Sequence, residues 1–343
     1  MKKKFLTIIT VVVLIMNLFT GCSGIREKKV SKSGFYFDTI ITITLYGTEE
    51  ESYITKCFSM ASKYEKMFSN SLDNTDITKI NENAGKKFVT VNDETIDLLN
   101  VAIDYGRKTN GKFDVTIGNL SDLWNFSEIS KNTTGDNNET TKDSIPSHEE
   151  IKSCLEHIDY SKIVIKGNKV LLKDASSKID LGGIAKGYIA DKMKKYLVSE
   201  GITSGIINLG GNVLTIGQKS DNSYFSVGIQ KPFDTRGNSI CNLKISDKSV
   251  VSSGVYERYF TVDDKLYHHI LDTTTGYPYN NGLYSVTIIS DYSCDGDALS
   301  TSCFALGLEN GMKLIENTKD TEAIFIDSDF NLYYSSGADE YIK

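Results

Sequence analysis

The stretch D-L-G-G-I-A-K-G-Y-I-A-D-K-M, from Asp180 to Met193, is the most unusual local sequence in this chain. An acid ends an apolar, strand-like segment, two glycines follow, and Lys186 stands at the start of a helix-like run. Glycines let a ligand approach the main chain closely, and the free N–H groups of a helix's first turn attract anions, phosphates above all. The stretch therefore predicts a strand-to-helix turn that binds an anion within reach of Lys186. It is neither a Walker A loop nor G-x-G-x-x-G, and an ordinary Gly-Gly turn is the alternative.

Two further clusters point to the same kind of site. L-G-G-N, Leu209 to Asn212, predicts a second turn with exposed main chain, although a plain tight turn would look the same. The run H-H-I-L-D-T-T-T-G begins with His268 and His269, two of the four histidines in the chain. Histidine suits proton transfer near neutral pH or contact with a phosphate oxygen. A histidine held in the core at a strand end is the alternative.

The run C-D-G-D-A-L-S-T, Cys294 to Thr301, carries a candidate metal site. On a helix, Asp297 and Thr301 are four residues apart, so their oxygens lie on one face. A carboxylate and a hydroxyl, completed by a carbonyl, water and phosphate oxygens, suit Mg²⁺, which prefers octahedral oxygen ligands and few protein groups. Asp295 competes for the same role. Acids placed in a first turn to complement the helix dipole are the alternative.

Helix-like and strand-like segments alternate irregularly along the chain, with several hairpin-like pairs of strands. This mixture favours an α+β fold over a regular βαβ wind. G-N at 167–168 predicts a hairpin turn, and Ser147 with Glu150 predicts a capping box. Apolar periodicity predicts helices over 50–68, 93–108, 184–199, 294–306 and 309–316. It predicts strands over 34–46, 162–166, 169–173, 179–181, 206–216, 285–290, 323–326 and 331–334, with 113–124 as a short strand or loop.

The N-terminus predicts the location of the protein. Residues 1–21 have a basic start and an apolar stretch that ends in Gly21-Cys22, which is the layout of a bacterial lipoprotein signal peptide. Cys22 would carry the lipid, residues 22–33 would be a tether, and residues 34–343 would form one catalytic domain on the extracytoplasmic face of the cell membrane. A plain N-terminal membrane anchor is the alternative, but the apolar run is shorter than the ~20 residues a spanning helix needs.

Composition narrows the function further. The net charge is −7, and removal of residues 1–21 would take away three lysines and make the remaining chain more negative. No basic stripe remains, which argues against binding of nucleic acid. Five scattered cysteines besides Cys22 make no disulfide framework and are expected in the core. The segment 127–145 is almost entirely polar and is expected to be a disordered surface insertion.

Taken together, these motifs resemble the ApbE-type FAD:protein FMN transferases, a family of secreted, often lipid-anchored enzymes. D-L-G-G-I-A-K-G-Y, L-G-G-N, S-G-V-Y-E-R, H-H-I-L-D, D-A-L-S-T and F-D-V-T-I-G-N-L, which begins at Phe113, occur in the family's order and at comparable spacings through nearly all of the mature chain. The resemblance implies an ApbE-like, T-fold-related catalytic unit of two intimate halves. It also implies that a threonine hydroxyl of an acceptor protein attacks the FMN phosphorus of FAD, with Mg²⁺ at the pyrophosphate and AMP as the leaving group.

The resemblance also assigns residues. It implies metal ligands at Asp297, Thr301 and the main chain near Gly183. His269 is our own candidate for the residue beside the reacting phosphate, where it would orient that phosphate or take the threonine proton, a role that a carboxylate such as Asp297 could share. The FAD contacts that the resemblance implies are Phe37, Ser71, Lys112, Phe113, Asp114, Asp180, Lys186 and Ile270. The family usually has Met-Gly-Thr where this chain has Phe37-Asp38-Thr39, and an aromatic residue near Ser71.

Two other functions fit the same motifs. Water in place of the acceptor would make the protein an FAD pyrophosphatase that yields FMN and AMP. A flavin-scavenging lipoprotein would bind FAD without turnover, although the Asp297 and Thr301 pair favours an enzyme, because a mere binder has little need of a reactive metal.

Overall fold

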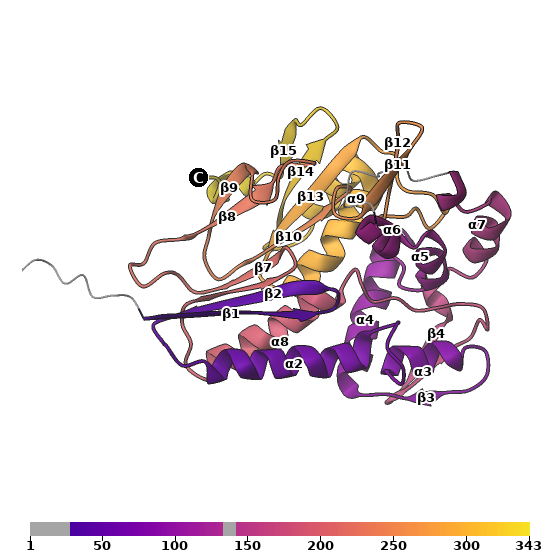
Figure 1. Ribbon diagram of the computed structural model, residues 1–343, viewed down its shortest axis with the longest axis horizontal. Coiled ribbons are helices and arrows are strands. Elements are labelled where there is room, and N and C mark those ends of the chain that lie inside the picture. Colours follow the sequence, from indigo (N-terminus) through magenta and orange to yellow (C-terminus); the bar gives the residue numbers. More distant parts are fainter. Residues whose placement is uncertain (1–27, 133–141) are drawn as a thin grey trace, which may run out of the picture.

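The computed structural model describes residues 28–132 and 142–343, which form an α+β fold around one large antiparallel sheet (Figure 1). Its eight strands are ordered β1-β2-β6-β7-β10-β13-β14-β15. The expected fold class is thus confirmed. These strands are β1 (Lys29–Tyr36), β2 (Thr39–Tyr46), β6 (Gly205–Leu209), β7 (Asn212–Ile216), β10 (Ser249–Gly254), β13 (Leu283–Ser290), β14 (Glu322–Asp327) and β15 (Leu332–Tyr334), and every neighbouring pair is antiparallel.

Three long helices, α2, α8 and α9, cover one face of this sheet. Their buried apolar faces and the inward side chains of the strands make one continuous core, and α4 extends it toward the β3-β5-β4 sheet. Burial of that apolar surface is the main force that holds the helices to the sheet. The helices are α2 (Ser52–Phe68), α3 (Asp76–Glu82), α4 (Asp93–Lys108), α5 (Gly118–Trp124), α6 (Phe126–Asn132), α7 (His148–Leu155), α8 (Ala185–Ser199) and α9 (Ser293–Glu316), and the small sheet has β3 (Val89–Thr90), β4 (Ile163–Lys166) and β5 (Lys169–Leu172).

A hairpin of β8 (Phe225–Gln230) and β9 (Ser239–Ile245) covers the opposite face of the large sheet. Alternate residues of β8 are buried, as expected for a strand with one wet face. Neighbouring residues of β14 divide between the two sides, since Phe325 belongs to the main core and Ile326 to the core under the hairpin. The sheet is therefore buried on both faces in this region.

A separate apolar cluster joins α5, α6 and α7 to the hairpin of β11 (Tyr259–Val262) and β12 (Lys265–His268), at the right of Figure 1. Trp124 is fully buried there, and its Nε1 donates a 2.8 Å hydrogen bond to Gly276 O. The segment that follows the histidine pair is fixed in this way to the region that begins at Phe113.

Four expectations about local structure were wrong. Residues 179–181, expected as a strand, are irregular and follow a single isolated bridge between Ile117 and Lys178. The strand expected over 34–46 is a hairpin, with Phe37 and Asp38 both at positive φ in its turn. Because β1 begins at Lys29, the last part of the expected tether is a sheet strand. The segment 113–124 ends in helix α5 rather than in a strand, since Leu120 and Trp124 fall on one buried helical face.

The expected insertion over 127–145 is partly ordered. Helix α6 and a 3₁₀ turn, Lys142–Ser144, flank residues 133–141, which lie outside the described residues, as do the expected signal peptide and Cys22. The polar composition of α6 made the sequence look disordered there. In the structure, Phe126 at the start of α6 stacks on Trp124 and on Phe260 and holds the helix in place. Buried aromatic contacts of this kind hold a segment that its other residues would leave in solution.

Other expectations are confirmed. The Ser147–Glu150 capping box and the hairpin at 167–168 are present. Gly210 and Gly211 form a two-residue turn with positive φ at both positions, as a tight hairpin requires. The five cysteines in the described residues are free thiols; Cys57, Cys294 and Cys303 are buried. Gly307 breaks the helical geometry of α9 between the two expected helices.

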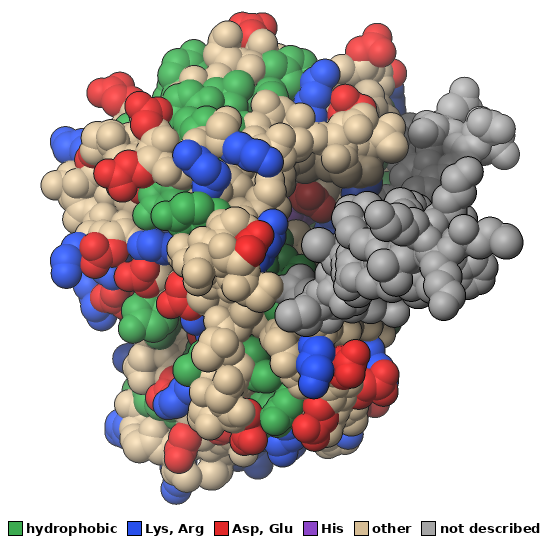
Figure 2. All heavy atoms as spheres, turned by 90° about the vertical axis from the view of Figure 1, so that its left-hand side faces the viewer, with side chains coloured by type: hydrophobic (Ala, Val, Ile, Leu, Met, Phe, Trp, Pro, Cys, Tyr) green, Lys and Arg blue, Asp and Glu red, His purple; other side chains and the backbone are tan. Residues whose placement is uncertain are grey.

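The distribution of charged side chains on the surface agrees with the modest net charge of −7. On the face shown in Figure 2, acidic and basic side chains are interspersed, and hydrophobic side chains gather toward the top. Within the described residues, no helix is long and apolar enough to cross a membrane.

Candidate functional site

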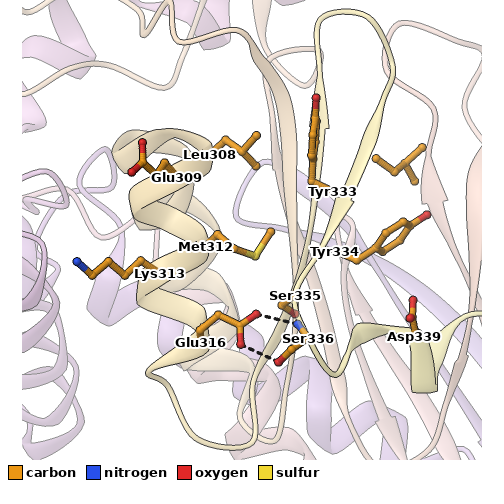
Figure 3. Close-up of a pocket in the computed structure, with 11 residues that line it drawn as sticks. Leu308, Glu309, Met312, Lys313, Glu316, Tyr333, Tyr334, Ser335, Ser336 and Asp339 are labelled. Atoms are coloured by element: carbon orange, nitrogen blue, oxygen red, sulfur yellow. Dashed lines mark hydrogen bonds between the residues drawn. The ribbon is translucent and has the colours of Figure 1, made fainter.

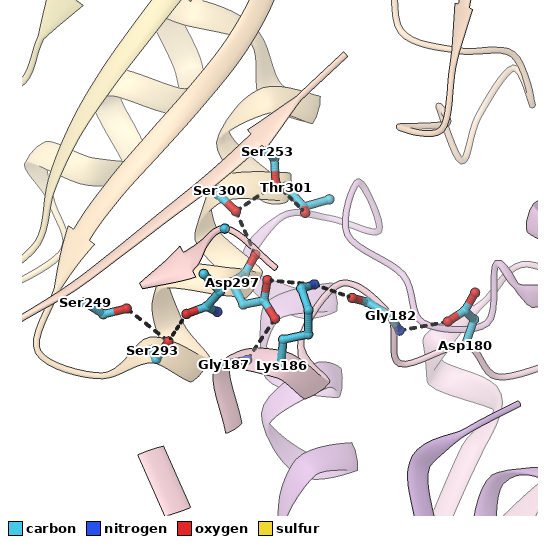
Figure 4. Close-up of polar contacts among 12 residues, drawn as sticks. Asp180, Gly182, Lys186, Gly187, Ser249, Ser253, Ser293, Asp297, Ser300 and Thr301 are labelled. Atoms are coloured by element: carbon cyan, nitrogen blue, oxygen red, sulfur yellow. Dashed lines mark hydrogen bonds and ion pairs between the residues drawn. The ribbon is translucent and has the colours of Figure 1, made fainter. Parts of the chain in front are cut away.

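The start of helix α8 lies open, as the sequence predicted. Asp180 is fixed by its N–H, which donates 2.7 Å to Val115 O, and its carboxylate accepts the Gly182 N–H at 2.7 Å. Gly182 is exposed, and the N-cap residue Ile184 makes no side-chain capping hydrogen bond. Lys186 extends back over this turn, and its Nζ lies 3.2 Å from Gly182 O (Figure 4). The turn therefore presents uncovered main chain beside a lysine ammonium.

Asp297 of α9 faces this turn. Its carboxylate is 5% exposed, its Oδ2 accepts the Gly187 N–H at 3.0 Å, and its Oδ1 lies 3.5 Å from Lys186 Nζ. A nearly buried carboxylate needs a compensating positive charge, and within the protein that charge comes from Lys186. Figure 4 shows these two side chains turned toward each other between α8 and α9.

Thr301 lies one helical turn beyond Asp297, and its Oγ1 is 3.1 Å from Ser253 Oγ of β10. A Cβ built on Gly183 would lie 3.9 Å from this hydroxyl, so the Gly183 main chain adjoins Thr301. Ser253 also bonds Ser300, whose hydroxyl donates to Asp297 O. The predicted metal ligands thus come from α9 and from the turn that precedes α8 into one small region.

These residues fit a magnesium ion. Carboxylate, hydroxyl and main-chain oxygen are the donors that Mg²⁺ prefers, and the Lys186 ammonium against Asp297 shows that this carboxylate already attracts a cation. Within the residues described, no group of three or more His, Cys, Asp or Glu side chains is arranged to hold a metal. A site with one carboxylate and several substrate or water oxygens agrees with magnesium rather than with zinc.

Asp295, the competing acid, points elsewhere. Its Oδ1 accepts the Tyr105 hydroxyl of α4 at 2.6 Å. Burial, together with the charge of Asp295, raises the pKa of Tyr105 far above its usual value, so the phenol stays protonated and donates. Asp295 therefore fastens α9 to α4, which leaves Asp297 as the carboxylate of the site.

Close packing of α8 on α9 brings the ligands together. A Cβ on Gly187 would overlap the Ser293 carbonyl and lie 2.7 Å from Cys294 Cα, so the two backbones touch at this glycine. Asp191 of α8 caps α9 by accepting the N–H groups of Ser293 and Cys294 at 2.8 and 2.9 Å. Burial raises the pKa of this carboxyl to about 6. The predicted L-G-G-N turn joins the same contact, because Asn212 Oδ1 accepts the Ser293 hydroxyl at 2.6 Å.

The two histidines differ in role. His268 is buried, its Nε2 lies 2.9 Å from Tyr279 O, and its Nδ1 accepts the Ile270 N–H at 3.3 Å, so both nitrogens are used by the main chain. Desolvation lowers the pKa of His268 to about 4. His268 is therefore the core histidine of the alternative interpretation, and it positions the main chain of Ile270.

His269 is partly exposed. Its Nδ1 lies 3.3 Å from Arg258 O, which leaves Nε2 for other partners. Desolvation, and then the charge of Arg258, lowers the pKa of His269 to about 3. The charge of Lys186 acts in the same direction, which relates this ring to the start of α8. His269 is thus a neutral imidazole at neutral pH, a hydrogen-bond acceptor and a weak base.

The remaining predicted flavin contacts form two groups, one at residues 112–114 and one that comprises Phe37 and Ser71. Phe113 is buried with its ring edge toward Tyr105, and a Cβ on Gly183 would lie 3.4 Å from it, so it adjoins the metal ligands. Lys112 Nζ contacts Asp272 and Thr274, each at 3.1 Å. These contacts attach the segment at 112–113 to the segment that follows the histidines.

Asp114 is committed to the protein. Its two oxygens accept from the N–H and hydroxyl of Thr116 and from the N–H of Tyr160, at 2.7 to 2.8 Å. Burial raises the pKa of this carboxyl. Asp114 therefore positions the main chain beside Phe113.

Phe37 and Ser71 lie apart from the metal ligands along the chain, in the β1–β2 turn and the loop after α2. The Phe37 N–H donates 2.6 Å to Glu65 Oε1, and the turn meets the second glycine turn, because Gly210 N donates to Ile40 O. Ser71 is exposed, and among the described residues its hydrogen-bond partner is Ser69 alone.

Several residues of the site were not predicted. Ser253, Gly187, Asp191 and Tyr105 each contact a predicted residue or helix directly. Ser253 stands in the quoted S-G-V-Y-E-R motif, and Gly187 in the opening stretch, so both had a signal as small residues in unusual runs. Asp191 and Tyr105 sit at ordinary helical positions, and only the packing of the helices gives them a role.

A pocket of about 980 Å³ lies elsewhere, between the second half of α9 and β15 (Figure 3). Leu308, Met312 and Tyr333 line it, and Glu316 closes one side by accepting from the N–H and hydroxyl of Ser336, each at 2.7 Å. It contains none of the residues that the sequence assigned to chemistry.

Comparison with known proteins decides the family. A profile of the ApbE family matches residues 37–325, a span that contains Asp180, Lys186, His269, Asp297 and Thr301. The chain belongs to the ApbE family. The resemblance inferred from its motifs is thereby confirmed.

Named relatives and solved structures of the ApbE family cover nearly the whole chain. An FAD:protein FMN transferase of Klebsiella pneumoniae is 33% identical over 312 residues, covering 90% of this chain and 93% of its own. One from Treponema pallidum is 28% identical, over 98% and 95% of the two chains. The crystal structure of the ApbE protein of Thermotoga maritima superposes with a TM-score of 0.81 at 28% identity, over 92% of this chain and all of its own. The flavin transferase ApbE of Vibrio cholerae gives 0.78 at 25%, over 92% and 99%.

Proposed function

We propose that this protein transfers FMN from FAD to a threonine hydroxyl of an acceptor protein and releases AMP, in a reaction that depends on Mg²⁺. The observation that carries the proposal is the meeting of Asp297, Thr301 and the Gly183 main chain with Lys186 at the uncapped start of α8. The names of the ApbE relatives, FAD:protein FMN transferase, support it.

The site has what transfer between phosphates requires. Such reactions depend on positioning and charge neutralisation more than on covalent chemistry by the protein. Lys186 and the exposed main chain at Gly182 would hold the pyrophosphate, and Asp297, Thr301 and the Gly183 carbonyl would hold Mg²⁺. When bound, the ion would neutralise charge that develops on the phosphate oxygens.

His269 would take the proton from the attacking hydroxyl. The threonine oxygen bonds to the FMN phosphorus, the bond from that phosphorus to the bridging oxygen breaks, and AMP leaves with the electron pair. The lowered pKa of His269 keeps its ring neutral, so Nε2 can accept a hydrogen bond from the attacking hydroxyl and take its proton as the bond to phosphorus forms and makes that proton acidic. Its Nδ1 contact with Arg258 O fixes the ring and leaves Nε2 as the other nitrogen.

The flavin side of FAD would lie along Phe113, Lys112 and Ile270, with Phe37 and Ser71 at its far end and Asp180 beside the phosphates. Phe113 next to Gly183 supports this direction, because it relates the aromatic side to the metal ligands. Asp114 would act through the main chain that it holds.

The decisive experiment incubates the protein with FAD and Mg²⁺, with and without membrane proteins as acceptors, and follows AMP release and acceptor mass. Transfer predicts AMP release that depends on acceptor and one added FMN on a threonine. AMP release that is indifferent to acceptor would favour the pyrophosphatase alternative. Tight FAD binding with no change in FAD over hours would favour the flavin-scavenging lipoprotein.

We also propose that Cys22 is diacylated and anchors the protein on the extracytoplasmic face of the membrane. The sequence of residues 1–22 supports this location. A diacyl group is a stable tether, unlike a single acyl chain. Replacement of Cys22 by serine should release the protein from the membrane fraction.

A further inference from the structure

The turn between β1 and β2 has a backbone that its sequence does not favour. Its two central residues, Phe37 and Asp38, are both left-handed, with φ of 53° and 54°, and the strands stay in register around them because Tyr36 pairs with Thr39. Two-residue turns of this kind favour asparagine followed by glycine, since a bulky side chain is strained at positive φ. A contact from another part of the chain is therefore needed to hold the β1–β2 turn.

That contact comes from Glu65, near the end of α2. Its Oε1 accepts the Phe37 N–H at 2.6 Å, and a hydrogen bond to an ionised carboxylate is stronger than one between neutral groups. The Glu65 carbonyl accepts the Ser69 N–H at 3.1 Å, and Ser69 Oγ in turn accepts the N–H groups of Ser71 and Leu72 at 3.2 and 3.1 Å. One residue of α2 thus holds the β1–β2 turn and begins the loop of Ser71.

The end of α2 is packed on the start of α8. Tyr64 and Phe68 of α2 meet the Tyr188 ring edge-on, with ring centroids 6.0 and 5.7 Å apart, and all three side chains are buried. Tyr188 directly follows Gly187, whose N–H bonds Asp297. Figure 1 shows α2 and α8 side by side below β1 and β2. The helix that carries Glu65 is therefore fixed to the part of α8 that contacts the candidate site.

The β1–β2 turn also touches the L-G-G-N turn. A Cβ on Gly210 would lie 2.2 Å from Thr39 Oγ1, and the Gly210 N–H donates to Ile40 O at 3.2 Å. Asn212, which follows that second turn, accepts the Ser293 hydroxyl at the start of α9. The β1–β2 turn thus lies between α2 and a turn that contacts the start of α9, so its position bears on the shape of the site.

We propose that Glu65 is a positioning residue for the flavin end of FAD, and that its carboxylate acts by holding the strained β1–β2 turn in place before FAD binds. This inference rests on the proposed function, in which Phe37 and Ser71 lie at the far end of the flavin. Glu65 itself does not touch FAD. A wall that is already ordered loses less conformational entropy when the ligand arrives, and this is how a preformed turn raises affinity.

A pair of ligands separates the flavin end from the phosphate end. ADP-ribose shares the adenosine and the diphosphate with FAD, but it lacks the isoalloxazine ring and the ribityl chain. Binding to the full chain is measured by calorimetry, with EDTA so that no FAD is consumed. Glu65→Ala should raise the Kd for FAD about tenfold, which is ~1.4 kcal/mol, and leave the Kd for ADP-ribose within about twofold of wild type.

Two further variants test the route through the turn. Glu65→Gln keeps an oxygen for the Phe37 N–H but loses the charge, so the Kd for FAD should rise only about threefold. Glycine accepts left-handed backbone without strain. Asp38→Gly, added to Glu65→Ala, should therefore return the Kd for FAD to within about threefold of wild type, because the turn then needs less help from α2.

Glu51 supplies the matched control. It is the N-cap residue of α2, and its carboxylate contacts Lys32 of β1, so it joins the same two elements at the opposite end of the hairpin. Glu51→Ala should change the Kd of neither ligand. An effect of Glu51→Ala as large as that of Glu65→Ala would show that any loosening of β1 on α2 weakens FAD binding, and would overturn the specific role of Glu65.

The remaining outcomes are distinct. An unchanged Kd for FAD in Glu65→Ala, or an equal loss for both ligands, would overturn the inference, and so would a failure of Asp38→Gly to restore binding. If Glu65→Ala does not fold, Glu65→Gln decides in the same way, with no change in the Kd for FAD as the result that overturns. Wild-type protein that binds FAD no more tightly than ADP-ribose, with or without Mg²⁺, would overturn the flavin site of the proposed function and this inference with it.

Discussion

The Gly187 N–H donates a 3.0 Å hydrogen bond to Asp297 Oδ2, across 110 residues of sequence. This bond ties the first turn of α8 to the face of α9 that carries the proposed Mg²⁺ ligands. It can form because Gly187 has no side chain and lets the two backbones touch. The same contact brings Lys186 within reach of Asp297, so the anion-binding turn and the cation ligands are one structure.

Asp297 and Asp295 should separate binding chemistry from stability. Asp297→Asn removes the charge that faces Lys186 but keeps an oxygen for Gly187, so we expect Mg²⁺-dependent AMP release to fall at least 100-fold, about 3 kcal/mol, with little change in Tm. Asp295→Asn weakens the contact with the Tyr105 hydroxyl and should lower Tm while the dependence of the rate on Mg²⁺ stays the same. The reverse pattern would show that the wrong acid was assigned to the metal.

Gly187 and Gly183 should fail in different ways when changed to alanine. At Gly187 the new methyl would overlap main-chain atoms of Ser293, which cannot move aside singly, so we expect a loss of about 3 kcal/mol or more in urea unfolding. At Gly183 the methyl would meet Phe113 and Thr301 at ordinary distances. Gly183→Ala should therefore keep the wild-type unfolding free energy and lose activity, because the methyl stands where the ligand binds. Equal destabilisation of both variants would contradict this account of the helix contact.

His269 should remain active in mild acid. Desolvation and the neighbouring Arg258 lower its pKa to about 3, so the ring stays neutral well below pH 6.5. At saturating Mg²⁺ and FAD, we expect kcat for transfer to be flat from pH 7 to about pH 5. His269→Ala should slow transfer while FAD still binds. An acid limb near pH 6.5 that vanishes in His269→Ala would show that the ring titrates normally.

Stability should depend on pH through two buried groups of opposite sign. The pKa of His268 is lowered to about 4, so between pH 6.5 and 4 the unfolded chain binds more protons and stability falls as pH falls, by about 3 kcal/mol at most. The pKa of Asp191 is raised to about 6, so the folded chain binds more protons between pH 6 and 4 and stability rises as pH falls. His268→Gln should reduce the loss of Tm between pH 6.5 and 4.5, and Asp191→Asn should enlarge it. Parallel changes in the two variants would contradict these assignments.

Local patterns predicted much of the fold. Apolar periodicity predicted the bounds of α4, and the paired turn residues at 167–168 and 210–211 predicted two hairpins. Such signals can be recognised from the sequence because they depend on residues that are close to one another along the chain. The β1–β2 turn was missed because Phe37-Asp38 has no turn signature. Its left-handed backbone is held by Glu65 of α2, a contact between distant parts of the chain.

The sequence by itself determined the chemistry available to this protein: an acid, two glycines and a lysine at a helix start, and a carboxylate and a hydroxyl one turn apart on another helix. Spacing along a helix decides which residues share a face, but not what that face meets. Only the tertiary structure decided that Asp297 rather than Asp295 faces Lys186, because Tyr105 of α4 takes the other acid. Likewise His268 and His269 are alike in sequence, and they differ in role because Ile270 and Tyr279 use both nitrogens of the first, whereas the second keeps one for another partner.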